Sequence, residues 1–370
     1  MTQTISHATR PEPLTLIELC RAIAAIMVVT FHAGGAFAAE KYFAREVFAD
    51  LFVFGSSGVQ FFFALSGFII TYVHFEDINR PRSLKRYLWR RMVRIYPIYW
   101  LIFAGVLCVM LLVPSFREDV PAPPTLLKSL TLIPQNPDLV GGTGAPVIVV
   151  AWSMQYEVMF YALFAVFIVS ARLGAIVLLG CALWIALGGA GYVLPFPLNF
   201  MSPANFSVFA FGVLAALTLQ VYQPRRPALI FSAGLLLFVT LAGSEVVLAL
   251  SGDSLGPSWL TITCYGLGSC LIIFGLASWE QTAGIRAPGI LRALGQSSYV
   301  LYLIHFPLIS LLCKVLSPGS GHIAYDTSSF VIICLTCVGI AHATHLLVEA
   351  PLGNFLRSKR QYAVFNTSVR

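Results

Sequence analysis

Long apolar stretches recur along the chain, and polar residues are concentrated in the segments between them. About 20 mainly apolar residues are enough for a helix to cross the hydrocarbon core of a membrane. Backbone groups in lipid must be hydrogen-bonded within the protein, so helices rather than open strands are expected. Ten stretches have this length: about 14–38, 51–73, 95–113, 147–169, 173–191, 205–222, 228–250, 258–278, 296–316 and 329–349. The pattern predicts an all-α, polytopic transmembrane helical bundle of about ten spans.

Composition strengthens this interpretation. The 370 residues are 58% hydrophobic and only 11% charged, with a mean hydropathy of +0.82. A soluble globular domain does not need so much apolar surface, and the excess extends along the whole chain. We therefore expect one integral-membrane domain over 1–370, with a core at about 14–351 and a short cytoplasmic tail at 352–370.

Lysine and arginine are distributed unevenly between alternate loops. If the N-terminus is cytoplasmic, the cytoplasmic segments hold most basic residues, including the dense group from Arg80 to Arg94. The opposite side holds four, Lys41, Arg45, Arg117 and Lys128. Positively charged loops favour the cytoplasm, and an even number of spans returns the chain to that side. Both termini are therefore expected in the cytoplasm. The net charge of +7 is then a topology signal, and no nucleic-acid partner is expected.

The first span contains two ionisable residues, Arg21 and His32, eleven positions apart. At about 100° per residue they lie within roughly 20° of each other on one helical face. Such residues usually face a polar cavity in the membrane, and histidine is the default general base near neutral pH. A structural alternative remains open. Arg21 could extend to the cytoplasmic interface, with Glu18 as a partner, and His32 could satisfy a buried hydrogen bond.

The segment RYLWRRMVRIYP is basic and includes Arg90, Arg91 and Arg94. In one interpretation it is a membrane-surface helix whose arginines hold lipid phosphates. Arginine also binds the phosphates of soluble ligands through paired hydrogen bonds. The sharper hypothesis is therefore a binding surface for a nucleotide-bearing donor.

Further polar residues lie within or at the ends of later spans. Glu157 follows Trp152 and Ser153 in the fourth span, His305 lies near the middle of the ninth, and Glu349 ends the tenth. A carboxylate within a span is costly, so a catalytic role and a paired structural role are both considered for Glu157. A lone histidine in a helix is more often a packing residue, so His305 ranks below the histidine of the first span.

No metal site is expected. All eight cysteines lie in apolar spans. Cys334 and Cys337 have CxxC spacing, but no second pair or polar ligand flanks them, so packing is the favoured interpretation. His342 and His345 in the last span are also interpreted as packing residues.

Together, these segments resemble the acyltransferase 3 family of bacterial integral-membrane O-acyltransferases. The resemblance extends from Ile17 to Pro351. Its motifs are the acidic Glu18, the Arg-x10-His pair Arg21 and His32, GV-x-x-FF-x-LSGF at 58–68, RR-x-x-R-x-x-P at Arg90, Arg91, Arg94 and Pro97, W-S-x-x-x-E at Trp152, Ser153 and Glu157, Tyr302 to Pro307 with His305, and Glu349-x-Pro351. Each motif alone is weak, whereas their order and spacing are specific.

The resemblance implies an enzyme that moves an acyl group, most simply acetyl, from cytoplasmic acyl-CoA to a hydroxyl of a cell-surface glycan or lipid-linked polysaccharide repeat unit. It implies a multi-pass protein of the bacterial inner membrane with no tightly bound cofactor. Acyl-CoA is then the donor substrate. Membrane lipid and the glycan acceptor are the expected partners, with polysaccharide-biosynthesis proteins as further ones.

The resemblance also implies residue roles. His32 matches the essential histidine of the family and Arg21 its partner, and Glu157 is expected to orient His32 or to hold the sugar. Donor contacts are implied for Arg90, Arg91 and Arg94, and supporting or substrate contacts are expected for Glu18, Trp152, Ser153, His305 and Glu349.

Two other functions fit a polytopic membrane protein. Polar residues at mid-membrane also line the paths of secondary transporters and flippases. No pair of inverted halves with matching broken spans is visible, however, and a transporter leaves the basic segment unexplained. The second alternative is a scaffold in a polysaccharide-export complex, in which the first-span pair is dispensable.

Overall fold

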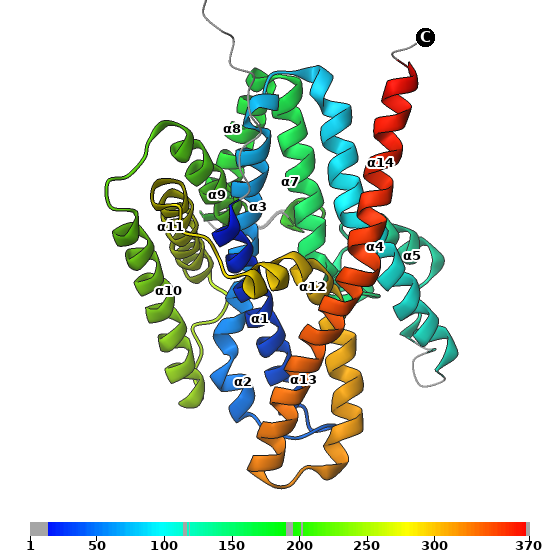
Figure 1. Ribbon diagram of the computed structural model, residues 1–370. Helices are drawn as coiled ribbons and strands as arrows, with labels where there is room; N and C mark the ends of the chain where they lie inside the picture. Colours follow the sequence, from blue (N-terminus) through cyan, green and yellow to red (C-terminus); the bar gives the residue numbers. More distant parts are fainter. Residues whose placement is uncertain (1–13, 114–116, 118, 190–194, 201–202, 368–370) are drawn as a thin grey trace, which may run out of the picture.

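The computed structural model describes residues 14–113, 117, 119–189, 195–200 and 203–367. Within these residues every regular element is helical (Figure 1). The long helices are α1 (Thr15–Ala38), α3 (Gly58–His74), α4 (Leu84–Leu112), α7 (Trp152–Val169), α8 (Ala171–Gly189), α9 (Pro203–Val221), α10 (Pro227–Leu250), α11 (Trp259–Ala283), α12 (Gly289–Leu316), α13 (Ile323–Thr344) and α14 (Ala350–Thr367). The short ones are α2 (Val47–Leu51), α5 (Pro123–Leu130) and α6 (Pro137–Val140). The predicted all-α bundle is confirmed.

Nine helices of the described part are long and apolar enough to cross a membrane. The expected span at 173–191 falls in α8, of which Ala171–Trp184 is described as an apolar helix. Residues 190 and 191 lie outside the described part.

Two elements extend beyond their predicted limits. The expected span at 95–113 begins earlier, because α4 already starts at Leu84 and carries the basic segment in the same 29-residue helix. The last span does not end at Glu349. It passes through one π-helical turn, His345–Glu349, into α14. Pro351 is the second residue of α14 and follows directly on the π-helical turn, in which the N–H of Ala350 bonds to the carbonyl oxygen of His345.

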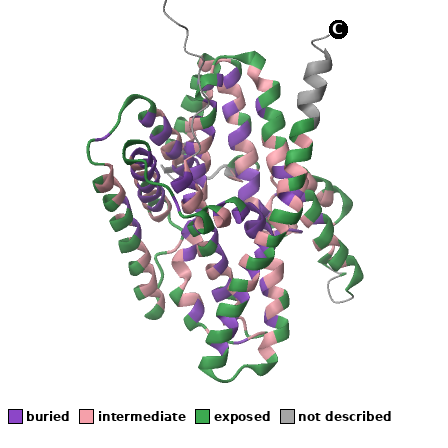
Figure 2. Ribbon diagram, viewed as in Figure 1, coloured by how far each residue is buried: buried purple, intermediate pink, exposed green. Residues whose placement is uncertain are grey.

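Close helix packing at glycine positions defines the centre of the bundle. A Cβ atom at Gly295 of α12 would collide with the backbone oxygen of Glu18 in α1. The same holds between α3 and α9, where a Cβ at Gly67 would meet the carbonyl of Phe209. Small residues allow such backbone approach between membrane helices. Figure 2 shows the buried residues gathered in the centre, whereas α10 at the edge has few buried residues.

The start of α1 is capped by a residue far away in sequence. Leu14 provides no side-chain cap. Instead Glu280 of α11 accepts hydrogen bonds from the backbone N–H groups of Thr15 (2.7 Å) and Leu16 (2.8 Å) and from the Thr15 hydroxyl (2.8 Å). The first N–H groups of a helix have no intrahelical partner, and a carboxylate also complements the helix dipole. This carboxylate therefore fixes the start of α1 against the end of α11.

Replacing the remote cap should destabilise the protein. In Glu280→Ala the N–H groups of Thr15 and Leu16 lose their acceptor, so we expect the free energy of unfolding to fall by about 1–3 kcal/mol. The midpoint of thermal unfolding in detergent measures this. The control is Glu76→Ala, because Glu76 is 64% exposed and its pair with Arg80 is long at 3.4 Å. Equal midpoints for the two variants would contradict the capping role.

Candidate functional site

Two adjoining pockets lie among α1, α3, α4, α7, α12 and α14, and they share Arg21, Arg91 and Arg94. We call the first the aromatic pocket; it encloses about 850 Å³, partly open to solvent, and its lining includes Phe62, Phe63, Ser66, Ser153, Met154, Glu157, Tyr161, Ser298, Tyr299 and Tyr302. We call the second the basic pocket; it encloses about 1700 Å³, also partly open, and its lining includes Glu18, Arg90, Gln296, His345, Glu349, Gly353, Asn354 and Arg357. The two pockets meet at the shared arginines.

The basic pocket carries an excess of positive charge. Five arginines line it against two glutamates. Arg94 pairs with Glu349 (Nη1 to Oε1, 3.2 Å), whose other oxygen lies 2.6 Å from Nδ1 of His345 in the π-helical turn. Arg21 forms no hydrogen bond or ion pair with any residue in the described part of the chain. Its guanidinium is therefore available to an anion at the junction of the two pockets.

A chain of polar contacts through the buried His74 holds Arg91. Its Nη2 lies 2.7 Å from Nε2 of His74, whose Nδ1 lies 2.8 Å from Asp77 Oδ2; Arg86 donates to Asp77 Oδ1 at 2.7 Å. Arginine can only donate, so Nε2 of His74 accepts and Nδ1 donates to the carboxylate. Sequence reasoning missed His74 and Asp77. Their i, i+3 spacing at the end of the second span was the available signal.

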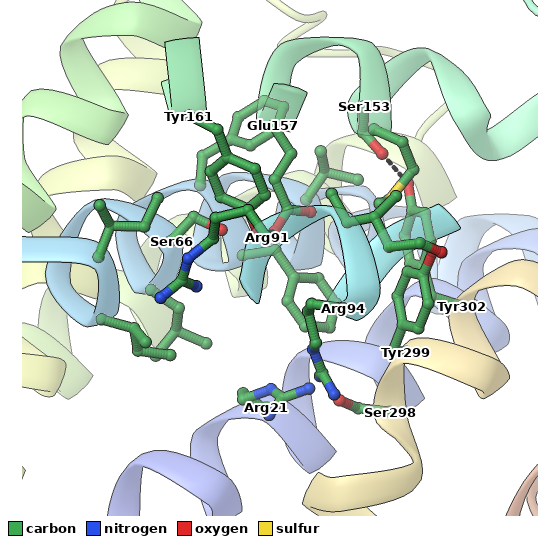
Figure 3. A pocket seen from close by; sticks show the side chains of 18 residues that line it. Arg21, Ser66, Arg91, Arg94, Ser153, Glu157, Tyr161, Ser298, Tyr299 and Tyr302 are labelled. Carbon is green, nitrogen blue, oxygen red and sulfur yellow. Dashed lines mark hydrogen bonds between the residues drawn. The ribbon is translucent and has the colours of Figure 1, made fainter. Parts of the chain in front are cut away.

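The Arg91 guanidinium also packs over two tyrosine rings, at 5.7 Å from the centroid of Tyr87 and 5.4 Å from that of Tyr161. Tyr161 in turn donates a hydrogen bond to Glu157. Figure 3 shows these α7 side chains on one side of the aromatic pocket, with Arg21 and Arg94 toward the other. The carboxylate and the arginines thus share one cavity in which a ligand could lie.

The opposite wall of the aromatic pocket comes from α12. Tyr302 and Ser153 are joined through their hydroxyls at 2.6 Å, drawn as a dashed line in Figure 3. Ser298 is fully buried on the same face, and its hydroxyl has no hydrogen-bond partner in the described part of the chain. Neither Ser298 nor Tyr302 was among the residues chosen as site candidates from sequence. This wall therefore adds to the cavity two hydroxyl groups, those of Ser298 and Tyr302, for which the sequence predicted no role.

His32 lies apart from the lining of both pockets. Its Nδ1 is 2.9 Å from the carbonyl oxygen of Val28 and 3.2 Å from Nε2 of His305. The ring of Tyr302 links this pair to the aromatic pocket, since it lines the pocket and its centroid is 5.8 Å from that of His305. Glu157 makes no hydrogen bond to His32, although both residues are described; its partner is Tyr161.

The structure divides the sequence candidates into three groups. Arg21, Arg91, Arg94, Ser153 and Glu157 line the aromatic pocket; Glu18, Arg90 and Glu349 line the basic pocket with the shared arginines; His32 and His305 form a pair beside Tyr302. Trp152 is outside these groups and packs against Phe63 and Tyr156. Among the described residues, no group of three or more His, Cys, Asp or Glu side chains is arranged to hold a metal ion.

Comparisons with known proteins identify the family of the chain. The family model of the acyltransferase domain, Acyl_transf_3, matches residues 15–342. The chain is 29% identical over 326 residues to the exopolysaccharide production protein ExoZ of Rhizobium meliloti (strain 1021), covering 86% of this chain and 96% of that protein. It is 26% identical over 345 residues to acyltransferase MdmB of Streptomyces mycarofaciens, covering 84% of each. No solved structure matches. The family match covers most of the chain, so this multi-pass membrane protein belongs to the acyltransferase 3 family.

Proposed function

We propose that the protein is a membrane O-acyltransferase that moves an acyl group, acetyl in the simplest case, from cytoplasmic acyl-CoA to a hydroxyl of a cell-surface glycan or lipid-linked polysaccharide repeat unit. One observation carries the proposal: a basic pocket opens into an aromatic pocket at Arg21, Arg91 and Arg94. Acyl-CoA has the matching chemistry, with phosphates at one end and an uncharged thioester at the other.

The phosphates of the donor would lie in the basic pocket. Arginine binds phosphate through two parallel charge-assisted hydrogen bonds, and it remains charged at any physiological pH. Arg90 and Arg94 project from α4, Arg357 from α14 and Arg21 from α1, so the pocket offers cations from three helices. Arg21 at the junction would then orient the thioester end as it enters the aromatic pocket.

The acceptor would approach from the side of His32. On α1 this residue lies eleven positions beyond Arg21, or about 16 Å along the helix axis. His32 would take the proton of the acceptor hydroxyl as the oxygen attacks the thioester carbon. The new C–O bond forms, the C–S bond breaks, and the departing CoA thiolate receives that proton. In an alternative mechanism with two steps, His32 itself first accepts the acyl group from CoA and then passes it to the acceptor hydroxyl.

Separate observations support the proposed class of acceptor and the proposed location in the bacterial inner membrane. The name of the Rhizobium relative refers to exopolysaccharide production, which favours a glycan acceptor. The concentration of lysine and arginine in alternate loops favours cytoplasmic termini in a bacterial inner membrane, where the basic pocket would face cytosolic acyl-CoA. Lipid and polysaccharide-biosynthesis proteins are the proposed neighbours.

Removing the proposed base should abolish acyl transfer. For His32→Ala we expect a loss of at least about 100-fold in kcat, because general base catalysis contributes roughly 10²–10⁴-fold. Acetyl transfer from labelled acetyl-CoA in membranes measures it, together with mass spectrometry of the surface polysaccharide from a complemented deletion strain. The matched control is His342→Ala, a histidine of α13 that lines neither pocket. Full activity of His32→Ala with normal membrane insertion would overturn the assignment.

Removing a proposed phosphate contact should weaken donor binding. For Arg90→Ala we expect the KM for acyl-CoA to rise about 10- to 100-fold, since a hydrogen bond to a charged group contributes about 1.5–3 kcal/mol. Initial rates at varied acyl-CoA concentration measure this. Arg172→Ala is the control, because Arg172 lies on α8 and is exposed. If the KM for acyl-CoA were unchanged, Arg90 would serve only to orient the chain in the membrane.

The buried histidine behind Arg91 should influence the donor indirectly. In His74→Phe the Arg91 guanidinium loses its acceptor, so we expect a KM for acyl-CoA raised about 5- to 30-fold, corresponding to about 1–2 kcal/mol. His74→Gln, which keeps an acceptor, should lie between this variant and the unmodified protein. The control is Arg80→Ala, an exposed residue of the same segment. A folded His74→Phe variant with an unchanged KM would show that Arg91 does not need this support.

A further inference from the structure

His32 of α1, which is half-buried, and His305 of α12 form a pair that joins the two helices. His305 is fully buried, and its Nε2 lies 3.2 Å from Nδ1 of His32, with the ring centroids 5.0 Å apart. We propose that His305 is a positioning residue that fixes the tautomer and the orientation of His32 and stabilises its protonated form. This inference rests on the proposed function, in which His32 is the base.

The hydrogen on His305 can be assigned from its neighbours. Its Nδ1 lies 3.0 Å from the carbonyl oxygen of Leu301, one turn earlier in α12. A carbonyl oxygen only accepts hydrogen bonds, so Nδ1 must carry the hydrogen. A neutral imidazole has one N–H, which leaves a lone pair on Nε2. His305 therefore presents an acceptor to its partner.

The same local contact recurs in α1. Nδ1 of His32 lies 2.9 Å from the carbonyl oxygen of Val28, one turn earlier, and also faces Nε2 of His305. Both neighbours are acceptors, so Nδ1 of His32 carries a hydrogen that the two share. If Nε2 of His32 carried the hydrogen instead, the lone pairs of His32 Nδ1, His305 Nε2 and the Val28 carbonyl oxygen would face one another. The favoured tautomer leaves Nε2 of His32 as the free basic nitrogen.

Neighbouring rings restrict the orientation of His32. Phe31 and Phe306 contact it edge-on, with centroids 5.1 and 5.4 Å from that of the imidazole. The basic nitrogen is thus held in one direction before any substrate arrives. Such pre-organisation lowers the reorganisation needed in the transition state.

The histidine pair also stabilises the positive charge that forms on His32 during acyl transfer. The O–H bond of the acceptor breaks and an N–H bond forms at Nε2 of His32. The resulting imidazolium donates from Nδ1 to His305 Nε2 and to the Val28 carbonyl. His305 keeps its own hydrogen and takes up no proton. When the thiolate leaves, His32 returns the proton from Nε2 to sulfur, and the pair is restored.

Substitution of His305 tests this role. In His305→Phe we expect kcat to fall about 10- to 100-fold, a part of the general base contribution, with the KM values for acyl-CoA and acceptor within about twofold. His305→Gln, whose side-chain oxygen can accept from Nδ1 of His32, should retain a several-fold higher kcat than His305→Phe. The control is Cys313→Ala, a fully buried residue two turns later on α12, which should leave kcat unchanged.

A double substitution separates this inference from the proposed function. In the His32→Ala background, His305→Phe should cause no further loss, because its effect acts through His32. If His32→Ala remains active, the proposed function is wrong about the base. If His32→Ala is inactive but His305→Phe keeps full kcat, only the positioning role is wrong. Should His305→Phe fail to insert, the smaller His305→Ala, which also lacks an acceptor, takes its place, and full kcat in that variant overturns the role.

Discussion

The close backbone contact between α1 and α12 is the constraint on which the candidate site depends. A glycine at 295 lets α12 lie against the carbonyl of Glu18, so the spacing of the two helices is fixed near their starts. Farther along, the same pair of faces brings Arg21 beside the wall that carries Ser298, and His32 beside His305. A side chain at 295 would collide with the backbone of Glu18 and so move these groups apart.

Charge within the bundle is arranged in two different ways. Groups that serve the fold are paired: Glu280 caps α1, and Asp77 is held by His74 and Arg86. At the junction of the pockets, Arg21 has no such partner among the described residues. A charged side chain in a membrane is costly, so an unpaired cation facing a cavity favours a ligand that supplies the missing anion. The contrast distinguishes structural charges from those available for binding.

Sequence predicted the features that depend on neighbouring residues. Apolar length gave the helices, and the helical period placed Arg21 and His32 on one face, where both now meet α12. The sequence could not pair His32 with His305, because 273 positions separate them and a lone histidine such as His305 is more often a packing residue. The sequence also predicted that the last span ends at Glu349, because the Ala-Pro that follows normally stops a helix. The role of His74 was hidden because its partner Arg91 lies on another helix.

The π-helical turn at His345–Glu349 sets the rotational phase of the C-terminal helix. One additional residue per turn rotates all later positions by about 100° relative to an uninterrupted α-helix. With this offset, Asn354 and Arg357 face the same pocket as Glu349, and α14 lies beside α4 (Figure 1). Without it, α14 would leave the bundle at the same place but turn a different stripe of side chains toward α4. A single residue in the chain length therefore determines which face of the final helix is presented to the pocket.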